Sequence, residues 1–353
     1  MLAVAGCGGS GKAVARSGSP PHRAGAGVAA PVRSPVTSGC GVLPPVAPGG
    51  VGEISVPVSP GIALGANHRT AFIHVPSGYR DRTPAPLVLE FHGAGPDASA
   101  VSYLRGSPLG RLADRAGFLD VYPQGLRYSN GNLGWNAYGP VLWPVAELPF
   151  LERLIDRVKA MFCVDARRIY ASGISNGANM VNYLACRPTA RLIAAVAPVA
   201  GPMYGQDDGP CAPPRAMAIL DIHGVDDPVV PYGGLPSPPN RYPLPSVPAW
   251  LTGWARLDRC RTTPRVQTVA AGQNLRRWTR CGDGADILAY AVHAGHGWPA
   301  TLGGRPAAEV VWQFLRAHPL PPHPDPVGAQ SFASPRVGDA RRVRRPEIAL
   351  RAT

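Results

Sequence analysis

The chain has 353 residues, of which 45% are hydrophobic, and a formal net charge of +13. This length and apolar content can bury a substantial core, and an α/β chain of ~200 to 250 residues often forms one domain. The two flanks, residues 1–50 and 319–353, carry +7 of the charge, and no DNA- or RNA-binding motif accompanies it. A nucleic-acid partner is therefore excluded.

Residues 1–50 predict a truncated export signal followed by a flexible linker. The chain starts MLAVAGC, and small residues before Cys7 are typical of the lipidation site of a bacterial lipoprotein. A complete signal has a basic start and a run of about 7 to 15 apolar residues, which this start lacks. Residues 8–50 are rich in Gly, Pro, Ser and Ala and suit a tether. We expect an extracellular or cell-surface protein, with Cys7 as its candidate lipid anchor to the membrane.

The other cysteines also favour export. They form an even set, which in an exported chain indicates disulfides, and six cysteines allow about 15 pairings. Six buried free thiols in a cytosolic protein remain the alternative. The set comprises Cys40, Cys163, Cys186, Cys211, Cys260 and Cys281.

Residues 51–318 are predicted to form an α/β domain. Short apolar runs alternate with amphipathic stretches, which is typical of a mostly parallel sheet with helices on both faces. Strands are expected at 54–58, 70–75, 87–91, 119–122, 168–172, 194–198, 216–222 and 286–293, and helices near 102–116, 148–162, 176–186, 248–257 and 307–317. Residues 319–353 are rich in Pro and Arg and are expected to form a disordered tail.

The strongest chemical signal is Gly173-Ile174-Ser175-Asn176-Gly177. It follows a predicted strand and opens a predicted helix, which is the setting of a nucleophile elbow. The two glycines allow a tight turn that exposes the serine hydroxyl, and the helix N-terminus favours developing negative charge. Ser175 is therefore the predicted nucleophile.

A serine nucleophile needs a histidine and an orienting carboxylate, and in α/β-hydrolases these follow in the order Ser, Asp, His. The loop after strand 216–222 holds Asp226 and Asp227, and the loop after strand 286–293 holds His296 between two glycines. His296 is preferred over His293 because His293 falls on the predicted strand. Spacing alone leaves Asp226 and Asp227 open, and His223 and His74 are expected to pack at strand ends.

An oxyanion hole requires two backbone donors, one after the nucleophile and one from the loop after the third strand. That loop reads Phe91-His92-Gly93-Ala94-Gly95. The N–H groups of Ala94 and Asn176 are the predicted donors, and His92 is expected to fix the loop by hydrogen bonds.

Two other patterns carry no function. Residues 6–12 match the spacing of a phosphate-binding loop, but Ala13 stands where Ser or Thr would bind Mg²⁺ and no strand precedes it. Neither clustered cysteine pairs nor H-E-x-x-H spacing occurs, so no metal site is predicted. No cofactor is implied.

These segments together resemble the polyhydroxybutyrate depolymerase and feruloyl esterase-like family of α/β-hydrolases, including actinobacterial esterase-like lipoproteins. The resemblance covers roughly residues 68–318. It is carried by LVLEFHGAG at 87–95, YPQG at 122–125, WNA at 135–137, RRIYASGISNGANM at 167–180, AAVAPVAG at 194–201, HGVDDPVVPY at 223–232 and GHGWP at 295–299.

The resemblance implies a role for each matching residue. It places the serine at Ser175, the histidine at His296, and the acid at Asp227, the aspartate before Pro228. It also implies a Cys260–Cys281 disulfide. A second pair, Cys163–Cys186, is expected at the bottom of the sheet, which leaves Cys40 with Cys211. Relatives usually carry paired aspartates where this chain has Val145-Ala146-Glu147, which puts a local structural contact in doubt.

The predicted activity is that of a serine carboxylesterase acting through an acyl-enzyme. Polyhydroxyalkanoates, feruloyl or acetyl groups on polysaccharide, and small acyl esters all suit the scaffold. Trp135 and Trp298 are candidate walls of the substrate pocket, although core packing explains Trp135 equally well. A peptidase with the same triad, or a non-catalytic surface protein on the same fold, are the alternatives.

Overall fold

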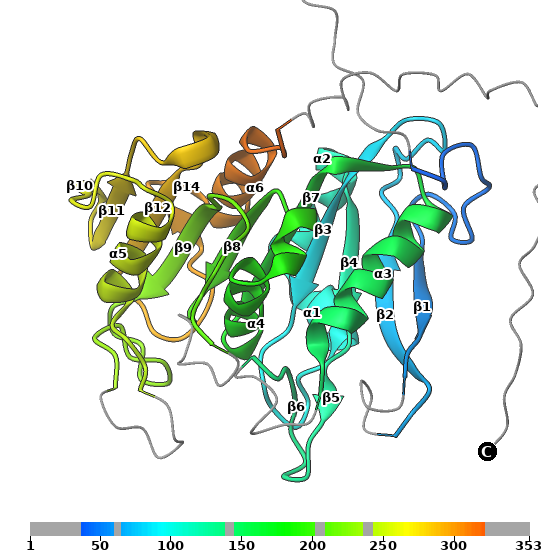
Figure 1. Ribbon diagram of the computed structural model, residues 1–353, viewed down its shortest axis with the longest axis horizontal. Coiled ribbons are helices and arrows are strands. Elements are labelled where there is room, and N and C mark those ends of the chain that lie inside the picture. The colour runs from blue at the N-terminus through cyan, green and yellow to red at the C-terminus, as the bar shows by residue number, and fades with distance from the viewer. Residues whose placement is uncertain (1–36, 60–64, 138–144, 202–208, 236–242, 322–353) are drawn as a thin grey trace, which may run out of the picture. The chain divides into compact units, whose positions relative to one another are not determined.

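A ten-stranded, mostly parallel sheet forms the centre of the computed structural model, which describes residues 37–59, 65–137, 145–201, 209–235 and 243–321 (Figure 1). The strand order is β1-β2-β4-β3-β7-β8-β9-β12-β11-β10. The strands are β1 Val51–Pro57, β2 His68–His74, β3 Ala85–Phe91, β4 Leu119–Pro123, β7 Val164–Ile174, β8 Ala195–Val199, β9 Ala218–Gly224, β10 Arg265–Ala270, β11 Gln273–Trp278 and β12 Ile287–Val292. The six strands from β4 to β12 in this order are parallel, and the pairs at both ends are antiparallel.

Helices cover both faces of the sheet. The helices are α1 Ala100–Gly106, α2 Ala113–Ala116, α3 Glu147–Met161, α4 Asn176–Ala185, α5 Val247–Leu257 and α6 Ala307–Ala317, and two short ribbons pair β5 Leu126–Arg127 with β6 Leu133–Gly134 and β13 Thr301–Leu302 with β14 Arg305–Pro306. Side chains of α3, α4 and α5 share one buried cluster, and those of α2 and α6 share another. The predicted α/β fold with helices on both faces is therefore confirmed.

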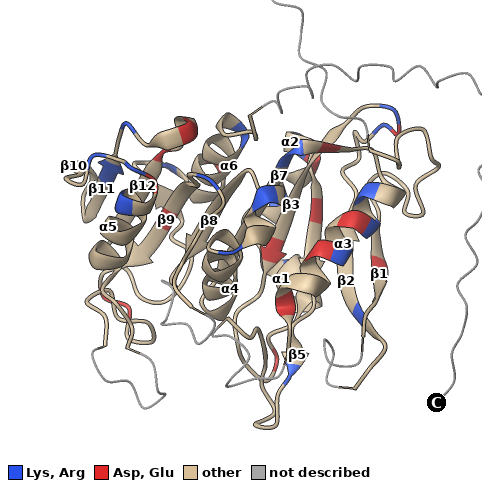
Figure 2. Cartoon of the chain, viewed as in Figure 1, with Lys and Arg blue, Asp and Glu red and all other residues tan. Residues whose placement is uncertain are grey.

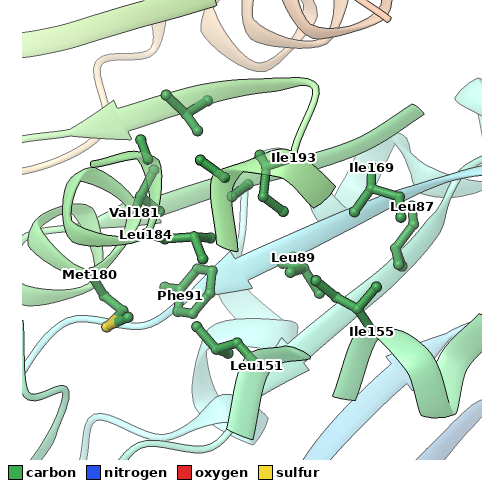
Figure 3. Packing of buried hydrophobic residues seen from close by; sticks show 14 of the residues in the cluster. Leu87, Leu89, Phe91, Leu151, Ile155, Ile169, Met180, Val181, Leu184 and Ile193 are labelled. Atoms are coloured by element: carbon green, nitrogen blue, oxygen red, sulfur yellow. The ribbon is translucent and has the colours of Figure 1, made fainter. Parts of the chain in front are cut away.

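The two core layers follow from the pleat of the central strands. All seven residues of β3 are buried, and successive side chains point to opposite faces. Leu87, Leu89 and Phe91 face α3 and α4, where they meet side chains such as Leu151 and Met180 (Figure 3). The outer surface of α3 carries acidic and basic residues in alternation, as Figure 2 shows, so this helix buries one stripe and exposes the other.

Most predicted elements match observed ones within a few residues, and two larger differences stand out beside the short ribbons β5–β6 and β13–β14, which were not predicted. The helix expected near 102–116 is split into α1, a 3₁₀ turn at Gly110–Leu112 and α2. Pro108 explains the break, because the preceding Ser107 takes an extended conformation (φ −58°, ψ 124°) that ends α1. The hairpin of β10 and β11 escaped prediction because β10 is largely exposed and shows no alternation of apolar residues.

Three disulfides are present, and two of the expected pairings were wrong. Cys260 pairs with Cys281 as the resemblance implied. Cys163 does not pair with Cys186, nor Cys40 with Cys211; the observed bonds are Cys40–Cys163 and Cys186–Cys211. The cause is chain proximity that the sequence does not display. Gly39 N–H donates to Lys159 O in the last turn of α3, four residues before Cys163, and Ala212 N–H donates to Cys186 O at the end of α4.

The ends of the folded region also extend beyond the expected boundaries. Residues from Thr37 to 50, assigned to the flexible linker, lie against the domain, where Thr37 is buried and Cys40 is bonded to Cys163. At the other end, Leu320 N–H donates to Arg167 O. Cys7 and residues 322–353 lie outside the described residues. Among the helices described, none is long and apolar enough to cross a membrane.

A carboxyl group is buried in the middle of β9. Asp221 is fully buried, and neither of its side-chain oxygens has a hydrogen-bond partner within the described part of the chain. Burial raises the pKa of this carboxyl to about 8, because the charged form loses its hydration. Asp221 is therefore protonated near neutral pH.

Removal of the Cys40–Cys163 disulfide should destabilise the fold more than removal of Cys260–Cys281. The first bond closes a loop with a sequence separation of 123 and the second one of 21. The loop entropy removed from the unfolded chain is worth roughly 5 kcal/mol for the longer loop and 3 kcal/mol for the shorter one. Urea unfolding of the two double Cys→Ser variants under non-reducing conditions measures the difference. An equal or larger loss for the Cys260/Cys281 variant would contradict this ranking.

Asp221 should make the fold less stable as the pH rises from about 4 to about 8. Between these values the folded chain keeps a proton on Asp221 that the unfolded chain, with a pKa near its ordinary value of 3.8, has released. Asp221→Leu should therefore stabilise the protein by a few kcal/mol more at pH 8 than at pH 4, on the order expected for such a shift. Urea unfolding across this range tests it, with the exposed Asp97→Asn as control. Parallel pH curves for Asp221→Leu and the wild type would show that the carboxyl is charged in the fold.

Candidate active site

Ser175 occupies a strained turn between β7 and α4. Its backbone has φ 56° and ψ −122°, a conformation that non-glycine residues rarely adopt. The flanking glycines make this turn possible. A Cβ on Gly177 would lie 2.2 Å from Phe91 O, and one on Gly173 would lie 2.8 Å from Gly177 C. The predicted strand-turn-helix setting of a nucleophile elbow is therefore present.

Asp227 and His296, the predicted acid and base, lie in contact with each other. They lie in the loops that follow β9 and β12, which are neighbouring parallel strands. His296 Nδ1 and Asp227 Oδ2 are 2.8 Å apart. The Asp227 side chain is fully buried, and its Oδ1 accepts the N–H groups of Val229 and Val230, both at 2.8 Å. These bonds hold the carboxylate against Nδ1 of His296, and the other ring nitrogen, Nε2, does not take part in this contact.

The two competing residues form a separate pair. His293 Nδ1 lies 3.2 Å from Asp226 Oδ2, with both side chains about two thirds exposed. His293 lies just after β12, which ends at Val292, and not on the strand as expected. The structure thus distinguishes Asp227 from Asp226, because only Asp227 contacts His296.

His223 supports the acid loop from the end of β9. Its Nε2 donates to Val230 O at 2.8 Å and lies 3.5 Å from Asp227 Oδ2. Burial lowers the pKa of this imidazole, so the ring is neutral at physiological pH. The expected packing role of a strand-end histidine fits these contacts. His74, the other such histidine, is the last residue of β2, and its Nε2 lies 3.2 Å from Oδ1 of Asp114 in α2.

The loop after β3 lies against the nucleophile turn. A Cβ on Gly93 would lie 3.4 Å from Ser175 Cβ, so the chain that carries Ala94 passes close to the serine. His92 fixes this loop. Its Nδ1 donates to Gly93 O at 2.7 Å, and its Nε2 accepts Gly125 N–H at 2.9 Å. Burial lowers the pKa of the His92 imidazole to about 4, and the resulting neutral ring can make both bonds at once.

Trp135 packs beneath the loop and does not form a pocket wall. The residue is 2% exposed, and its ring lies edge-on to Phe91 with the ring centroids 5.1 Å apart. Its Nε1 donates to His92 O at 3.0 Å. Of the two interpretations of Trp135, core packing fits these contacts better than a pocket wall. Trp298, the second candidate, is partly buried next to His296, and its Nε1 donates to Tyr103 OH at 3.3 Å.

The sequence interpretation missed the role of the Asn176 side chain. Asn176 Oδ1 accepts Trp135 N–H at 2.7 Å, and Asn176 Nδ2 donates to Trp135 O at 3.1 Å. This pair of bonds joins the start of α4 to a segment 41 residues earlier in the chain. The only signal was the polar residue between Ser175 and Gly177, which alone does not reveal its partner.

A buried carboxyl pair lies behind the loop, on the opposite face of β3 from Phe91. Tyr122 OH donates to Asp120 Oδ2 at 2.5 Å and lies 3.2 Å from Glu90 Oε1. Ser107 Oγ donates to Glu90, at 2.6 Å from Oε2. Burial raises the pKa of Glu90 to about 7, and burial together with the nearby Glu90 also raises that of Asp120. Two such carboxyls favour a shared proton.

Comparisons with known proteins show which families the chain resembles. The sequence matches the family described as "Esterase PHB depolymerase" over residues 71–232. Feruloyl esterase B from Piromyces equi is 30% identical over 258 residues, which are 72% of this chain and 46% of that protein. Feruloyl esterase C from Emericella nidulans is 27% identical over 300 residues, which are 82% of this chain and 95% of that protein.

A solved structure shows the same fold. The acetyl xylan esterase from Aspergillus awamori matches with a TM-score of 0.55 at 16% identity, covering 75% of this chain and 99% of that chain. The chain spans less than half the length of feruloyl esterase B, so that protein contains a large part with no counterpart in the match. The family match, the relatives and the fold agree: the chain is similar to the esterase PHB depolymerase family over residues 71–232 and has the α/β-hydrolase fold.

Proposed function

We propose that this protein is a serine carboxylic ester hydrolase in which Ser175 is the nucleophile, His296 the general base and Asp227 the orienting acid. The observation that carries the proposal is the 2.8 Å contact between His296 Nδ1 and buried Asp227 Oδ2. The strands β7, β9 and β12 run parallel, so Ser175, Asp227 and His296 all follow the carboxyl ends of strands on the same side of the sheet. Such a carboxylate keeps the proton on Nδ1 and leaves Nε2 as the base.

The reaction would proceed in two steps. In the first, Nε2 of His296 takes the proton of Ser175 Oγ as this oxygen attacks the ester carbonyl. The backbone N–H groups of Ala94 and Asn176 would stabilise the resulting oxyanion, and the imidazolium would then protonate the leaving alcohol. In the second, water gives a proton to the same nitrogen as it attacks the acyl carbonyl, and the imidazolium returns that proton to Ser175 Oγ as the bond between this oxygen and the acyl group breaks and the acid leaves. Asp227 would orient the imidazole through Nδ1 and stabilise the imidazolium each time it forms.

The acyl group is proposed from the names that the relatives carry. They point to feruloyl esters, to acetyl esters and, through the family, to polyhydroxybutyrate. Trp298 beside His296 is the remaining candidate for a pocket wall, because Trp135 is buried in the core. Small acyl esters share the same reacting group.

We also propose that the protein works outside the cytoplasm. Its three disulfides are typical of proteins that fold in an oxidising compartment. A lipid on Cys7 would hold it at a membrane surface.

Replacement of the proposed triad should abolish turnover while replacement of the neighbouring pair should not. Ser175→Ala and His296→Ala should each lower kcat by about 10⁴-fold or more, and Asp227→Asn by a similar order. Asp226→Asn and His293→Gln are the matched controls, because this exposed pair has the same chemistry and adjacent positions. They should keep kcat within about twofold. If the controls lost activity while Asp227→Asn kept it, the acid would be Asp226.

A panel of esters should rank the acyl preference. The full chain should hydrolyse p-nitrophenyl acetate and butyrate, and among methyl ferulate and short 3-hydroxybutyrate oligomers one should be preferred. Each activity should be lost with Ser175→Ala. A peptide p-nitroanilide should not be cleaved. Hydrolysis of the anilide alone would favour a peptidase, and no reaction by folded protein with any substrate would favour a non-catalytic binding protein.

A further inference from the structure

The side chain of Asn176 is held by two hydrogen bonds to the backbone of Trp135. One bond is 2.7 Å and the other 3.1 Å, and they use both ends of the amide. Asn176 directly follows Ser175 and begins α4. Its backbone N–H, a proposed oxyanion donor, can therefore turn only if these bonds break. Donors of this kind stabilise charge best when their orientation is set before the reaction.

Trp135 is also bonded to the loop that carries the second proposed donor. Its Nε1 donates to His92 O at 3.0 Å, two residues before Ala94. A Cβ on Gly134 would lie 3.5 Å from Ala94 Cβ and 2.9 Å from Asn176 Oδ1. The segment Gly134-Trp135 thus contacts both donor loops, and its position sets theirs relative to each other.

A buried ion pair holds this segment from the other side. Glu147, the first residue of α3, accepts Asn136 N–H on Oε1 at 3.0 Å. Its Oε2 lies 2.5 Å from Arg69 Nη1, with the two side chains 0% and 1% exposed. Arg69, on β2, also donates to Gln124 O at 3.0 Å. These contacts connect the first turn of α3 and β2 to the peptide that follows Trp135.

The Arg69 guanidinium is further enclosed by aromatic rings. It lies 3.9 Å from the ring centroid of Phe150 and 5.7 Å from that of Trp135. A buried ion pair contributes little net stability, because desolvation of two charges offsets their attraction, and apolar side chains often replace it without loss. The pair instead orients the Glu147 carboxylate. With Oε2 held by Arg69, Oε1 is fixed where it accepts Asn136 N–H.

We propose that Arg69 and Glu147 are positioning residues of the oxyanion site, acting through Trp135-Asn136 on the Asn176 side chain. The inference rests on the proposed function, because it assigns the pair to the same reaction. Neither residue touches the substrate. Their effect should appear in kcat, where the oxyanion forms, and much less in KM.

The test is a double-mutant cycle between Glu147 and Asn176, measured with p-nitrophenyl butyrate on the full chain. Glu147→Gln and Asn176→Ala should each lower kcat by about 10- to 100-fold. A misplaced donor loses part of the transition-state stabilisation that is lost in full when the donor is removed. KM should change little. The kcat of the double variant should be no lower than that of the less active single variant, because both changes release the same peptide.

A second measurement separates positioning from general loss of stability. The affinity for an aliphatic trifluoromethyl ketone, whose adduct with Ser175 carries an oxyanion, should fall by the same factor as kcat. Asp165→Asn is the matched control. It breaks the Arg168–Asp165 ion pair of 2.6 Å near the start of β7, at the far end of that strand from Ser175. This control should lower the urea midpoint and leave kcat unchanged.

Each outcome decides the proposal. Wild-type kcat in folded Glu147→Gln, or losses that multiply in the double variant, would overturn it. If Glu147→Gln fails to fold, Glu147→Asp takes its place in the cycle, because it keeps the charge beside Arg69. It should show a smaller kcat loss that is again not additive with that of Asn176→Ala. Losses that multiply would again overturn the proposal. If neither the wild type nor Asp165→Asn hydrolyses any ester, the proposed function fails first. Activity that depends on Ser175 but not on Glu147 would overturn this inference alone.

Discussion

The close approach of Gly177 to β3 is the constraint on which the site depends. A side chain there would collide with Phe91 O at 2.2 Å and with His92 O at 2.5 Å. Because the two backbones are in contact, the turn that strains Ser175 and the loop that carries Ala94 form one unit. The sheet then needs only to bring two more loops to the same edge, and the neighbouring strands β9 and β12 do so with Asp227 and His296.

Burial controls the charges around this unit. The imidazoles of His92 and His223 are kept neutral, so they can accept or donate single hydrogen bonds without adding positive charge near His296. The carboxyls of Glu90 and Asp120 are raised in pKa on the opposite face of β3. Asp227 differs because two backbone N–H groups and His296 satisfy its oxygens. Asp227 is therefore a buried carboxyl whose two oxygens both have partners, which Asp221 lacks.

The sequence was sufficient to predict the elements whose apolar periodicity agrees with the order of strands and loops in the fold. Strand and helix positions around Ser175, Asp227 and His296 followed from periodicity, and the order of the three loops followed from the chemistry of the fold. It was insufficient where the partner lies elsewhere in the chain. The bond between Asn176 and Trp135, and the pairing of Cys40 with Cys163, depend on segments that meet only after folding. The β10–β11 hairpin lacks a buried face on β10 and so left no pattern to recognise.

The Cys40–Cys163 bond also determines how the domain bears tension. Cys163 immediately precedes β7, whose neighbours β3 and β8 hold it on both sides, whereas β1 lies at the edge of the described sheet with β2 as its neighbour. A pull on the chain before Cys40 is transmitted through the disulfide to the amino end of β7. This path reaches the central strand β7 without passing through the edge strand β1, and Ser175 lies at the other end of β7. A tether through the N-terminal segment would thus pull on the middle of the sheet and not on its edge.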